Sequence, residues 1–170
     1  AIKQADYKQA VTNLEKALEF SKKSADKARV HFILGQLNSL NGDREKAKYH
    51  YGKVLRYNAP FEMNFNARIN RALMGGSQKI KQELQKMLKD DKNVDFQDQI
   101  YFVLAQVHEK NGDMENAVVN YKKSAASSIN NPKQKALSYL AIADYYFKIP
   151  KYIDAQAFYD SSLISLPETH

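Results

Sequence analysis

The sequence predicts an all-helical protein built from a row of antiparallel helix pairs. Apolar residues recur at steps of three and four almost throughout the 170 residues, and strand-like alternation is absent. Only four prolines and six glycines interrupt this pattern. The tripeptide Asn-Gly-Asp occurs at 41–43 and again at 111–113, 70 residues later. Since 70 is twice 35, we expect a repeat of about 35 residues, which is the period of a helical solenoid.

A single helix over residues 5–22 is expected to come first. Asp6-Tyr7 opens it, and small or apolar residues follow at helical spacing, namely Tyr7, Ala10, Leu14 and Ala17. The later second helices share this pattern, so we interpret the segment as the second half of a helix pair.

The first complete pair is expected over residues 28–60. Its first helix ends at Asn41-Gly42, because a glycine can take the left-handed conformation that closes a helix. Asp43 can then cap the second helix. That helix is expected to end close to Pro60.

The second pair, expected over residues 61–92, departs from the others. Its corner falls at Gly75-Gly76-Ser77, near the position that the repeat requires. Arg68 stands where the other pairs have a small residue, and Ile80 replaces the alanine of the second helix. Ordinary sequence drift of a repeat explains these differences. The alternative is that this unit bends the superhelix or carries a contact with a partner. An apolar face remains, made of Phe61, Phe65, Ile69, Leu73, Leu84 and Leu88.

The last two pairs are expected over residues 98–131 and 136–167. The second Asn-Gly-Asp corner joins the helices of the first of these pairs, and residues 148–151 join those of the second. The domain organisation that follows is half a repeat and four helix pairs in one solenoid. The chain begins with Ala inside a helical pattern, so we interpret it as a piece of a longer protein.

These pairs resemble the tetratricopeptide repeat, whose pattern places Leu and a small residue in the first helix and Ala and an aromatic in the second. The pair at 28–60 supplies Leu34, Gly35, Gly42, Ala47, Tyr51 and Pro60. The pair at 98–131 supplies Tyr101, Leu104, Ala105, Gly112, Ala117 and Tyr121. The pair at 136–167 supplies Tyr139, Ile142, Ala143, Tyr146, Ala155, Tyr159 and Pro167. The resemblance implies a right-handed solenoid, with Gly35, Ala105 and Ala143 at close helix contacts.

The composition argues against several kinds of chemistry. The absence of Cys excludes thiolate catalysis, disulfides and Cys-ligated zinc. The four histidines form no helical pair with one another or with a carboxylate, so we expect no metal site. A phosphate-binding loop is also missing, because Gly75-Gly76 is not followed by Lys-Ser or Lys-Thr. The prediction is therefore a protein that is not an enzyme and has no cofactor.

The resemblance implies that a partner protein or extended peptide binds along the first helix of each pair. The candidate residues at or beside these inward positions are Arg29, Phe32, Gln36, Phe65, Arg68, Arg71, Phe102, Gln106, Glu109, Asp144 and Phe147. The alternative for the aromatic members is a place in the core. Some members of the family grip a C-terminal carboxylate with Lys, Asn and Arg at these positions. That clamp is missing here, which argues against a chaperone-tail adaptor of that type.

Residues 31–72 and 95–147 are similar to a narrower group, the large tetratricopeptide lipoproteins of Bacteroidota that gliding and type IX secretion require (the SprE/PorW type). The phrases that carry this resemblance are NAPFEMNFNARIN, DQIYF and NNPKQKALSYL. It implies a scaffold in the cell envelope, on the periplasmic side of the outer membrane. Its lipid anchor would lie outside these 170 residues.

Two other functions remain open at this point, a generic tetratricopeptide adaptor or co-chaperone-like peptide binder, and a basic RNA-binding solenoid. The net charge of +7 gives a mild preference for acidic partners. However, 26 basic residues are interleaved with 19 acidic ones along the chain, as on a solvated helix surface. We therefore expect no nucleic acid among the partners. The sequence gives no sign of an obligate oligomer.

Overall fold

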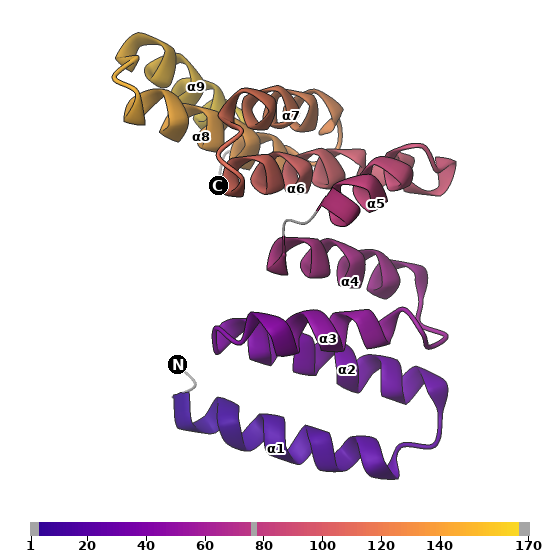
Figure 1. The fold of residues 1–170 in the computed structure, drawn as a ribbon. Helices are drawn as coiled ribbons and strands as arrows, with labels where there is room; N and C mark the ends of the chain where they lie inside the picture. Colours follow the sequence, from indigo (N-terminus) through magenta and orange to yellow (C-terminus); the bar gives the residue numbers. More distant parts are fainter. Residues whose placement is uncertain (1–3, 76–77, 167–170) are drawn as a thin grey trace. The chain divides into compact units, whose positions relative to one another are not determined.

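The computed structural model describes residues 4–75 and 78–166, and these residues form nine α-helices and one short 3-10 helix (Figure 1). No strand occurs in the described ranges, so the predicted all-α class is confirmed. The chain divides into two compact units, residues 1–75 and residues 76–170, each described below by itself.

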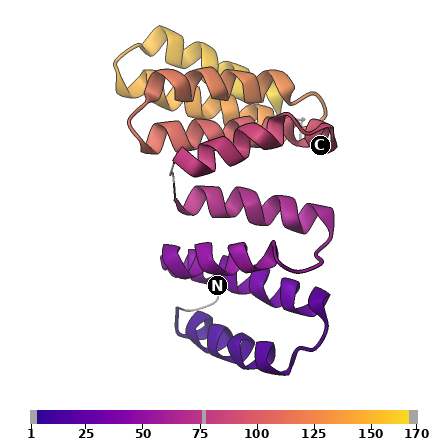
Figure 2. The same ribbon diagram turned by 45° about the vertical axis from the view of Figure 1, so that its right-hand side comes forward.

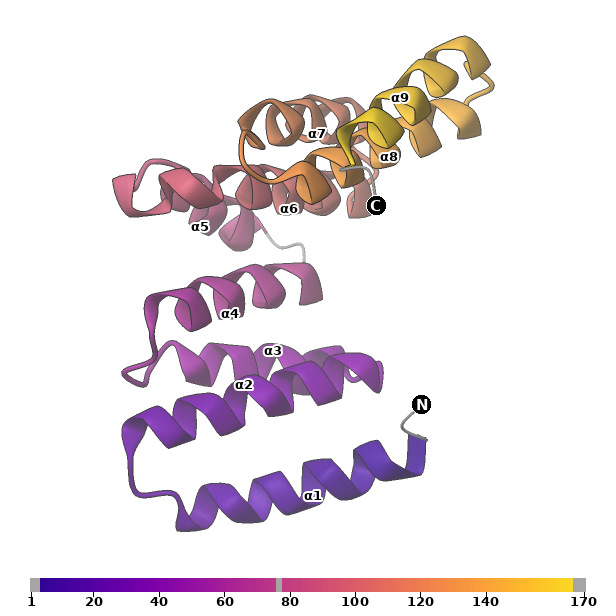
Figure 3. The ribbon, with the colours of Figure 1, turned by 180° about the vertical axis from the view of Figure 1, so that it is seen from behind.

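Unit 1 contains four helices, which are α1 (Gln4–Phe20), α2 (Ser24–Leu40), α3 (Arg44–Val54) and α4 (Phe61–Met74). Each helix packs on the next one along the chain, and α2 also contacts α4. Figures 1 and 3 show the four helices as successive antiparallel layers. A buried cluster of Ala47, Tyr51, Val54 and Ala67 lies where α3 meets α4.

Unit 2 contains α5 (Gln78–Leu88), the 3-10 helix η1 (Asp91–Phe96), α6 (Gln97–Lys110), α7 (Met114–Ser127), α8 (Pro132–Lys148) and α9 (Tyr152–Ser165). The pairs α6–α7 and α8–α9 pack closely, and α7 and α6 both contact α8 (Figure 2). The core of this unit is a cluster made of Ala105, Ala117, Val118, Tyr121 and Ile142.

The two Asn-Gly-Asp corners have the predicted geometry. Gly42 and Gly112 have φ values of 79° and 76°, in the left-handed region that favours glycine. The carboxylate of Asp43 accepts a hydrogen bond from the backbone N–H of Lys46 at 3.1 Å, and that of Asp113 accepts one from Asn116 at 3.3 Å. Each aspartate therefore caps the second helix of its pair, as expected.

The small residues of the first helices lie at close helix contacts, also as predicted. Ala105 and Ala143 are fully buried. At Gly35, a Cβ atom would stand only 2.7 Å from the ring of Tyr51. In α4 the expectation that Arg68 replaces the small residue was wrong, because Ala67 takes that place in the core and Arg68 beside it is exposed.

Two equivalent hydrogen bonds fix the register between the last two pairs at 38 residues. The hydroxyl of Ser124 in α7 donates to the carbonyl oxygen of Asp98 in α6 at 2.7 Å. The hydroxyl of Ser162 in α9 donates to the carbonyl oxygen of Ala136 in α8 at 2.9 Å. Residue n of the α6–α7 pair therefore corresponds to residue n + 38 of the α8–α9 pair.

The helix pair expected over 61–92 is divided between the units, because α4 belongs to unit 1 and α5 to unit 2. Of its expected apolar face, Phe65, Ile69 and Leu84 are buried, whereas Phe61 is 46% exposed. Ile80 is buried as well. Of the expected corner, residues 76–77 lie outside the described residues, as do Pro167 and His170. One continuous solenoid along the whole chain stays a prediction. The 3-10 helix η1 was not foreseen.

Candidate functional site

The candidate residues of unit 1 come from α2 and α4, which contact each other. On α2, Arg29 and Gln36 are exposed, at helical positions seven residues apart. Phe32 between them is half-buried, and its ring meets that of Tyr51 edge-on at 5.8 Å. Phe32 is therefore shared between the core and the surface, and α2 presents mainly its two polar groups.

On α4 the three candidates have different surroundings. Phe65 is buried, with 2% of its surface exposed, so it belongs to the core and offers no surface to a partner. This corrects the placement of Phe65 among groove residues, and the alternative of a core position holds. Arg68 is exposed, whereas Arg71 is half-buried and lies over Gly52 of α3. We call Arg29, Phe32, Gln36, Arg68 and Arg71 the basic face.

On α6 of unit 2, an acidic group lies beside an aromatic one. Phe102 is half-buried, and its ring meets that of Tyr121 edge-on at 5.3 Å. The Tyr121 hydroxyl donates a hydrogen bond to Oε2 of the exposed Glu109 at 2.7 Å. Burial, and secondarily this bond, raise the pKa of Tyr121, so the hydroxyl keeps its proton and remains a donor. Gln106 is half-buried on the same helix.

On α8 a second carboxylate is held by a tyrosine. The Tyr159 hydroxyl of α9 donates to Oδ1 of Asp144 at 2.8 Å, and this bond raises the pKa of Tyr159. Phe147 is 57% exposed, and its ring meets that of Tyr152 edge-on at 5.5 Å. We call Phe102, Gln106, Glu109, Asp144 and Phe147 the acidic face.

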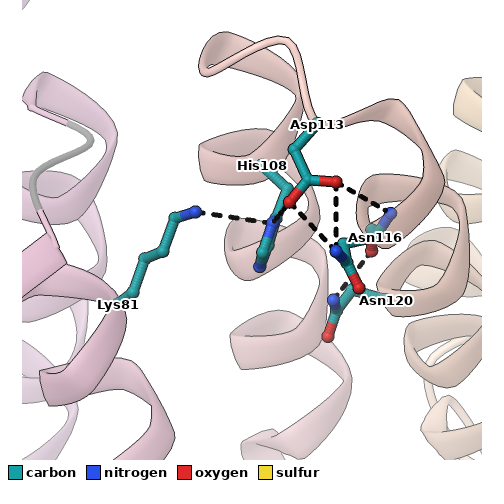
Figure 4. A network of polar contacts seen from close by, with 5 residues as sticks. All are labelled: Lys81, His108, Asp113, Asn116 and Asn120. Carbon is teal, nitrogen blue, oxygen red and sulfur yellow. Dashed lines mark hydrogen bonds and ion pairs between the residues drawn. The ribbon is translucent and has the colours of Figure 1, made fainter.

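A polar network at the second Asn-Gly-Asp corner was missed by the sequence reasoning, which gave no histidine a carboxylate partner (Figure 4). The Nδ1 atom of His108 lies 2.7 Å from Oδ2 of Asp113, across the corner. The side-chain amide of Asn116 donates to the same carboxylate. The pKa of Asp113 is lowered, first by the bond to His108 and then by the bond to Asn116. His108 and Asp113 are five residues apart, so the three- and four-residue spacing of helical neighbours does not indicate this pair.

Lys81 of α5 approaches this network, with its Nζ atom 3.4 Å from Nδ1 of His108 (Figure 4). When the Nδ1 proton is donated to Asp113, that nitrogen has no lone pair left for the ammonium group. We therefore assign the contact to the attraction between the ammonium group and the nearby carboxylate. The network ties α5 to the α6–α7 corner.

A second buried network surrounds Asp98 at the start of α6, which is only 3% exposed. Its Oδ2 atom accepts hydrogen bonds from Asn131 at 3.0 Å and from Ser128 at 3.3 Å. These donors stand in the turn between α7 and α8, so the carboxylate links three consecutive helices. Its position gives it a role in packing.

The described residues contain no group of three or more His, Cys, Asp or Glu side chains arranged for a metal ion. Within those same ranges, no helix is both long enough and apolar enough to cross a membrane.

Comparison with known proteins agrees with the helical fold. Residues 98–128, which span α6 and α7, match the model of the tetratricopeptide repeat family. The crystal structure of MamA matches 95% of this chain and 90% of its own, with a TM-score of 0.62 and 15% identity. PilF of Pseudomonas aeruginosa matches 98% of this chain and 72% of its own, with a TM-score of 0.62 and 23% identity.

Curated protein sequences give no match to this chain. The two identities are low, so the structural likeness shows the fold alone. Residues 98–128 match one tetratricopeptide repeat, and the chain shares its all-helical fold with MamA and PilF.

Proposed function

We propose that this chain is a non-catalytic scaffold that binds a partner protein or an extended peptide on its first helices. The tetratricopeptide fold supports the general class, because stacked helix pairs use their residues to bury one another and leave extended surfaces for partners. The observation that carries the proposal is the separation of charge between the two faces. The candidate residues of unit 1 include three arginines and no acid, and those of unit 2 include two acids and no base.

The chemistry of each face follows from this separation. The planar guanidinium groups of Arg29 and Arg68 suit carboxylates, which they can hold through two parallel hydrogen bonds. On the acidic face, Tyr121 and Tyr159 hold the carboxylates of Glu109 and Asp144 in position. We therefore expect the basic face to select acidic segments and the acidic face to select basic ones.

Charge reversal tests this proposal. The whole chain serves as bait for proteins of its native source, in parallel with Arg29→Glu/Arg68→Glu and Glu109→Lys/Asp144→Lys. Each double variant should lose a specific set of captured proteins while its circular dichroism stays that of the wild type. Lys16→Glu and Glu115→Lys reverse exposed charges away from both faces and should retain the full set. Capture that is identical for all five baits would refute the assignment of the faces.

The narrower proposal is a role in type IX secretion and gliding, in the cell envelope. It rests on the resemblance of residues 31–72 and 95–147, while the generic adaptor fits the family match and the structural neighbours equally well. Capture from envelope fractions followed by mass spectrometry separates the two. Recovery of secretion components that depends on the acidic or basic face would support the envelope role. Recovery of chaperones or ribosomal proteins would refute it.

A further inference from the structure

The two Asn-Gly-Asp corners carry a chemically reactive dipeptide. Asparagine followed by glycine is prone to spontaneous deamidation, because glycine has no side chain to hinder attack by its backbone nitrogen on the asparagine amide. Asn41-Gly42 and Asn111-Gly112 both have this sequence. Each asparagine stands at the end of the first helix of its pair, α2 or α6. Both corners are therefore candidate sites of covalent modification.

The reaction needs no reagent other than water. At the first corner, the nitrogen of Gly42 loses its proton to the solvent and forms a bond to the side-chain amide carbon of Asn41. The side-chain carbon–nitrogen bond breaks, and ammonia leaves after taking a proton from water. Water then opens the resulting succinimide ring at either carbonyl. The products are aspartate and isoaspartate, in which the backbone runs through the former side chain.

The folded backbone holds the glycine nitrogen away from this ring closure. The ψ angles of Asn41 and Asn111 are −3° and 6°, so the glycine nitrogen is eclipsed with the nitrogen of the asparagine itself. Ring closure needs the glycine nitrogen beside Cβ, which lies about 120° away around the tetrahedral Cα. Each corner must therefore open before its asparagine can react.

Backbone hydrogen bonds oppose this opening in the same way at both corners. At the first corner, the N–H of Gly42 donates to the carbonyl oxygen of Ser39 at 3.1 Å, and that of Asp43 donates to Asn38 at 2.9 Å. The second corner has the equivalent two bonds, at 2.9 Å and 3.0 Å. This pair of bonds, with the glycine in the left-handed region, is the Schellman motif that closes a helix.

The side chains of the two corners differ at one equivalent position. Because the corners are 70 residues apart, Asn38 of α2 corresponds to His108 of α6. His108 is only 16% exposed and reaches across its corner to Asp113, with 2.7 Å between Nδ1 and Oδ2. Asn38 instead donates to the carbonyl oxygen of Leu34 in its own helix at 2.8 Å, so this bond does not cross the corner.

The carboxylate of the first corner is held more weakly. Asp43 pairs with Lys46 of α3, the helix that it caps, at 3.5 Å between Oδ2 and Nζ. The Lys46 side chain is 63% exposed, and a surface ion pair of this kind contributes little to stability. The second corner therefore has a short side-chain contact between its two helices, while the equivalent contacts of the first stay within single helices.

We propose that Asn41 and Asn111 are sites of spontaneous deamidation, that the closed corners slow the reaction, and that Asn41 reacts first in the folded protein. The difference arises from the His108–Asp113 contact, which keeps the second corner closed for more of the time. This inference concerns the corners and is independent of the proposed scaffold function.

The modification weakens the corner in which it occurs. Deamidation of Asn41 places a carboxylate at the C-terminus of α2, where the helix dipole disfavours negative charge. Isoaspartate also adds a methylene to the backbone, which displaces the N–H groups of Gly42 and Asp43 from their carbonyl acceptors. Each molecule that reacts therefore carries a lasting record that its corner has opened.

Peptide mapping by mass spectrometry tests the proposal on the whole chain. The folded protein and the guanidinium-unfolded chain are incubated in the same mildly alkaline buffer, and the asparagine, aspartate and isoaspartate forms are separated by chromatography. In the unfolded chain the two sites should react at similar rates, because both are Asn-Gly-Asp. In the folded protein Asn41 should react about 10-fold more slowly and Asn111 about 100-fold more slowly, since the rate follows the population of the opened corner.

His108→Asn gives the second corner the side chain that the first has at the equivalent position. It should raise the rate at Asn111 in the folded protein about 10-fold and leave the rate in the unfolded chain unchanged. Asn41 in the same molecules is the internal control. Asp113→Asn, which removes the charge and keeps a capping oxygen, should also accelerate Asn111. Glu115→Gln removes an exposed charge from the first turn of α7 and should change neither rate.

The consequence for stability has its own measurement. Asn41→Asp reproduces the aspartate product, and its midpoint of thermal unfolding should lie below that of the neutral variant Asn41→Ser. Equal midpoints for the two variants would refute the destabilising effect of the new charge.

The rates can overturn each part of the proposal. An unfolded chain that stays unmodified would exclude both residues as deamidation sites, and equal rates in the folded and unfolded chains would refute the protection by the corners. If Asn111 reacts as fast as Asn41 in the folded wild type, or if His108→Asn leaves their ratio unchanged, the role of the His108–Asp113 contact is refuted.

Discussion

The Nδ1 atoms of His31 and His50 lie 3.0 Å apart in the interior of unit 1, between α2 and α3. Both side chains are buried, and the ring of Tyr57 stacks on His31 with 5.5 Å between centroids. One imidazole donates an Nδ1 proton and the other accepts it, so the accepting ring is neutral in this arrangement. Burial, followed by the proximity of His50, lowers the pKa of His31 from 6.5 to about 4, and burial also lowers the pKa of His50.

We expect the free energy of unfolding to decrease as the pH falls from 6.5 toward 4. In this window the unfolded chain protonates His31 and the folded chain does not, so acid favours the unfolded state. Stability is at its full value above pH 6.5, and the shift of this one histidine corresponds to a loss of about 3 kcal/mol at pH 4. Urea denaturation followed by circular dichroism at a series of pH values measures the effect.

The control for this prediction replaces both rings, in His31→Leu/His50→Leu, so that the site can no longer titrate. The unfolding free energy of this variant should depend much less on pH in the same window. His108→Gln, which leaves the buried pair intact, should keep the dependence of the wild type. A wild-type stability that is constant between pH 6.5 and pH 4.5 would contradict the prediction.

Gly35 and Gly52 should respond in opposite directions to alanine. At Gly35 the new Cβ atom would meet the ring of Tyr51 at 2.7 Å, and that ring is only 2% exposed, so it has little room to move. We expect a net loss of about 1–2 kcal/mol, because overpacking exceeds the gain in helix propensity. At Gly52 the nearest atom is 3.9 Å away, and the substitution should stabilise by up to about 1 kcal/mol. Thermal unfolding of the two variants shows whether each substitution stabilises or destabilises the protein. A Gly35→Ala protein as stable as Gly52→Ala would contradict a tight contact between residue 35 and the Tyr51 ring.

Ser124→Ala should destabilise unit 2 by about 1–3 kcal/mol. The Ser124 hydroxyl is fully buried, donates to the carbonyl of Asp98 and lies 2.8 Å from the hydroxyl of Ser138. Its removal takes one hydrogen bond from the carbonyl of Asp98 and one from the hydroxyl of Ser138, which keeps only its bond to Gln134 of its own helix. Ser161→Ala is the matched control, because that hydroxyl bonds only to its own helix, at Ala157. Chemical denaturation should show little change for the control, and similar curves for both variants would argue against a role for the inter-helix bond.

Loss of the capping aspartate should destabilise the second Asn-Gly-Asp corner more than the first. Asp43→Ala removes a helix cap, which costs about 1 kcal/mol. Asp113→Ala removes an equivalent cap and also the contact with His108, so its midpoint of thermal unfolding should fall further. Asp113→Asn retains the capping oxygen and should recover part of that loss. Equal midpoints for Asp43→Ala and Asp113→Ala would show that the histidine contact adds nothing.

Much of the fold could be predicted because its signals are local. Gly42 and Gly112 mark corners through their own backbone preference, and Asp43 and Asp113 cap helices within three residues of themselves. Helical periodicity then places the buried faces, as Ile80 and Leu84 show in the most divergent pair. The same periodicity places most polar candidate residues on the exposed side of their helices, opposite the buried faces.

Helical periodicity could not predict how exposed each aromatic candidate residue is. Phe32, Phe65 and Phe102 occupy similar places in their helices, yet Phe65 is buried and the other two are half-exposed. Their exposure depends on the neighbouring helix that covers each ring. The missed polar contacts have the same origin, because His31 and His50 are 19 residues apart and meet only when two helices pack.

Sequence patterns alone predicted the helices, the two Asn-Gly-Asp corners and most of the buried positions. Short-range backbone preferences and a period of three to four residues are enough for that. The division of the chain between α4 and α5 and the contact of His31 with His50 are seen only in the folded structure. These features depend on which helix packs on which side chains, and that is the combined result of many weak contacts between residues distant in sequence.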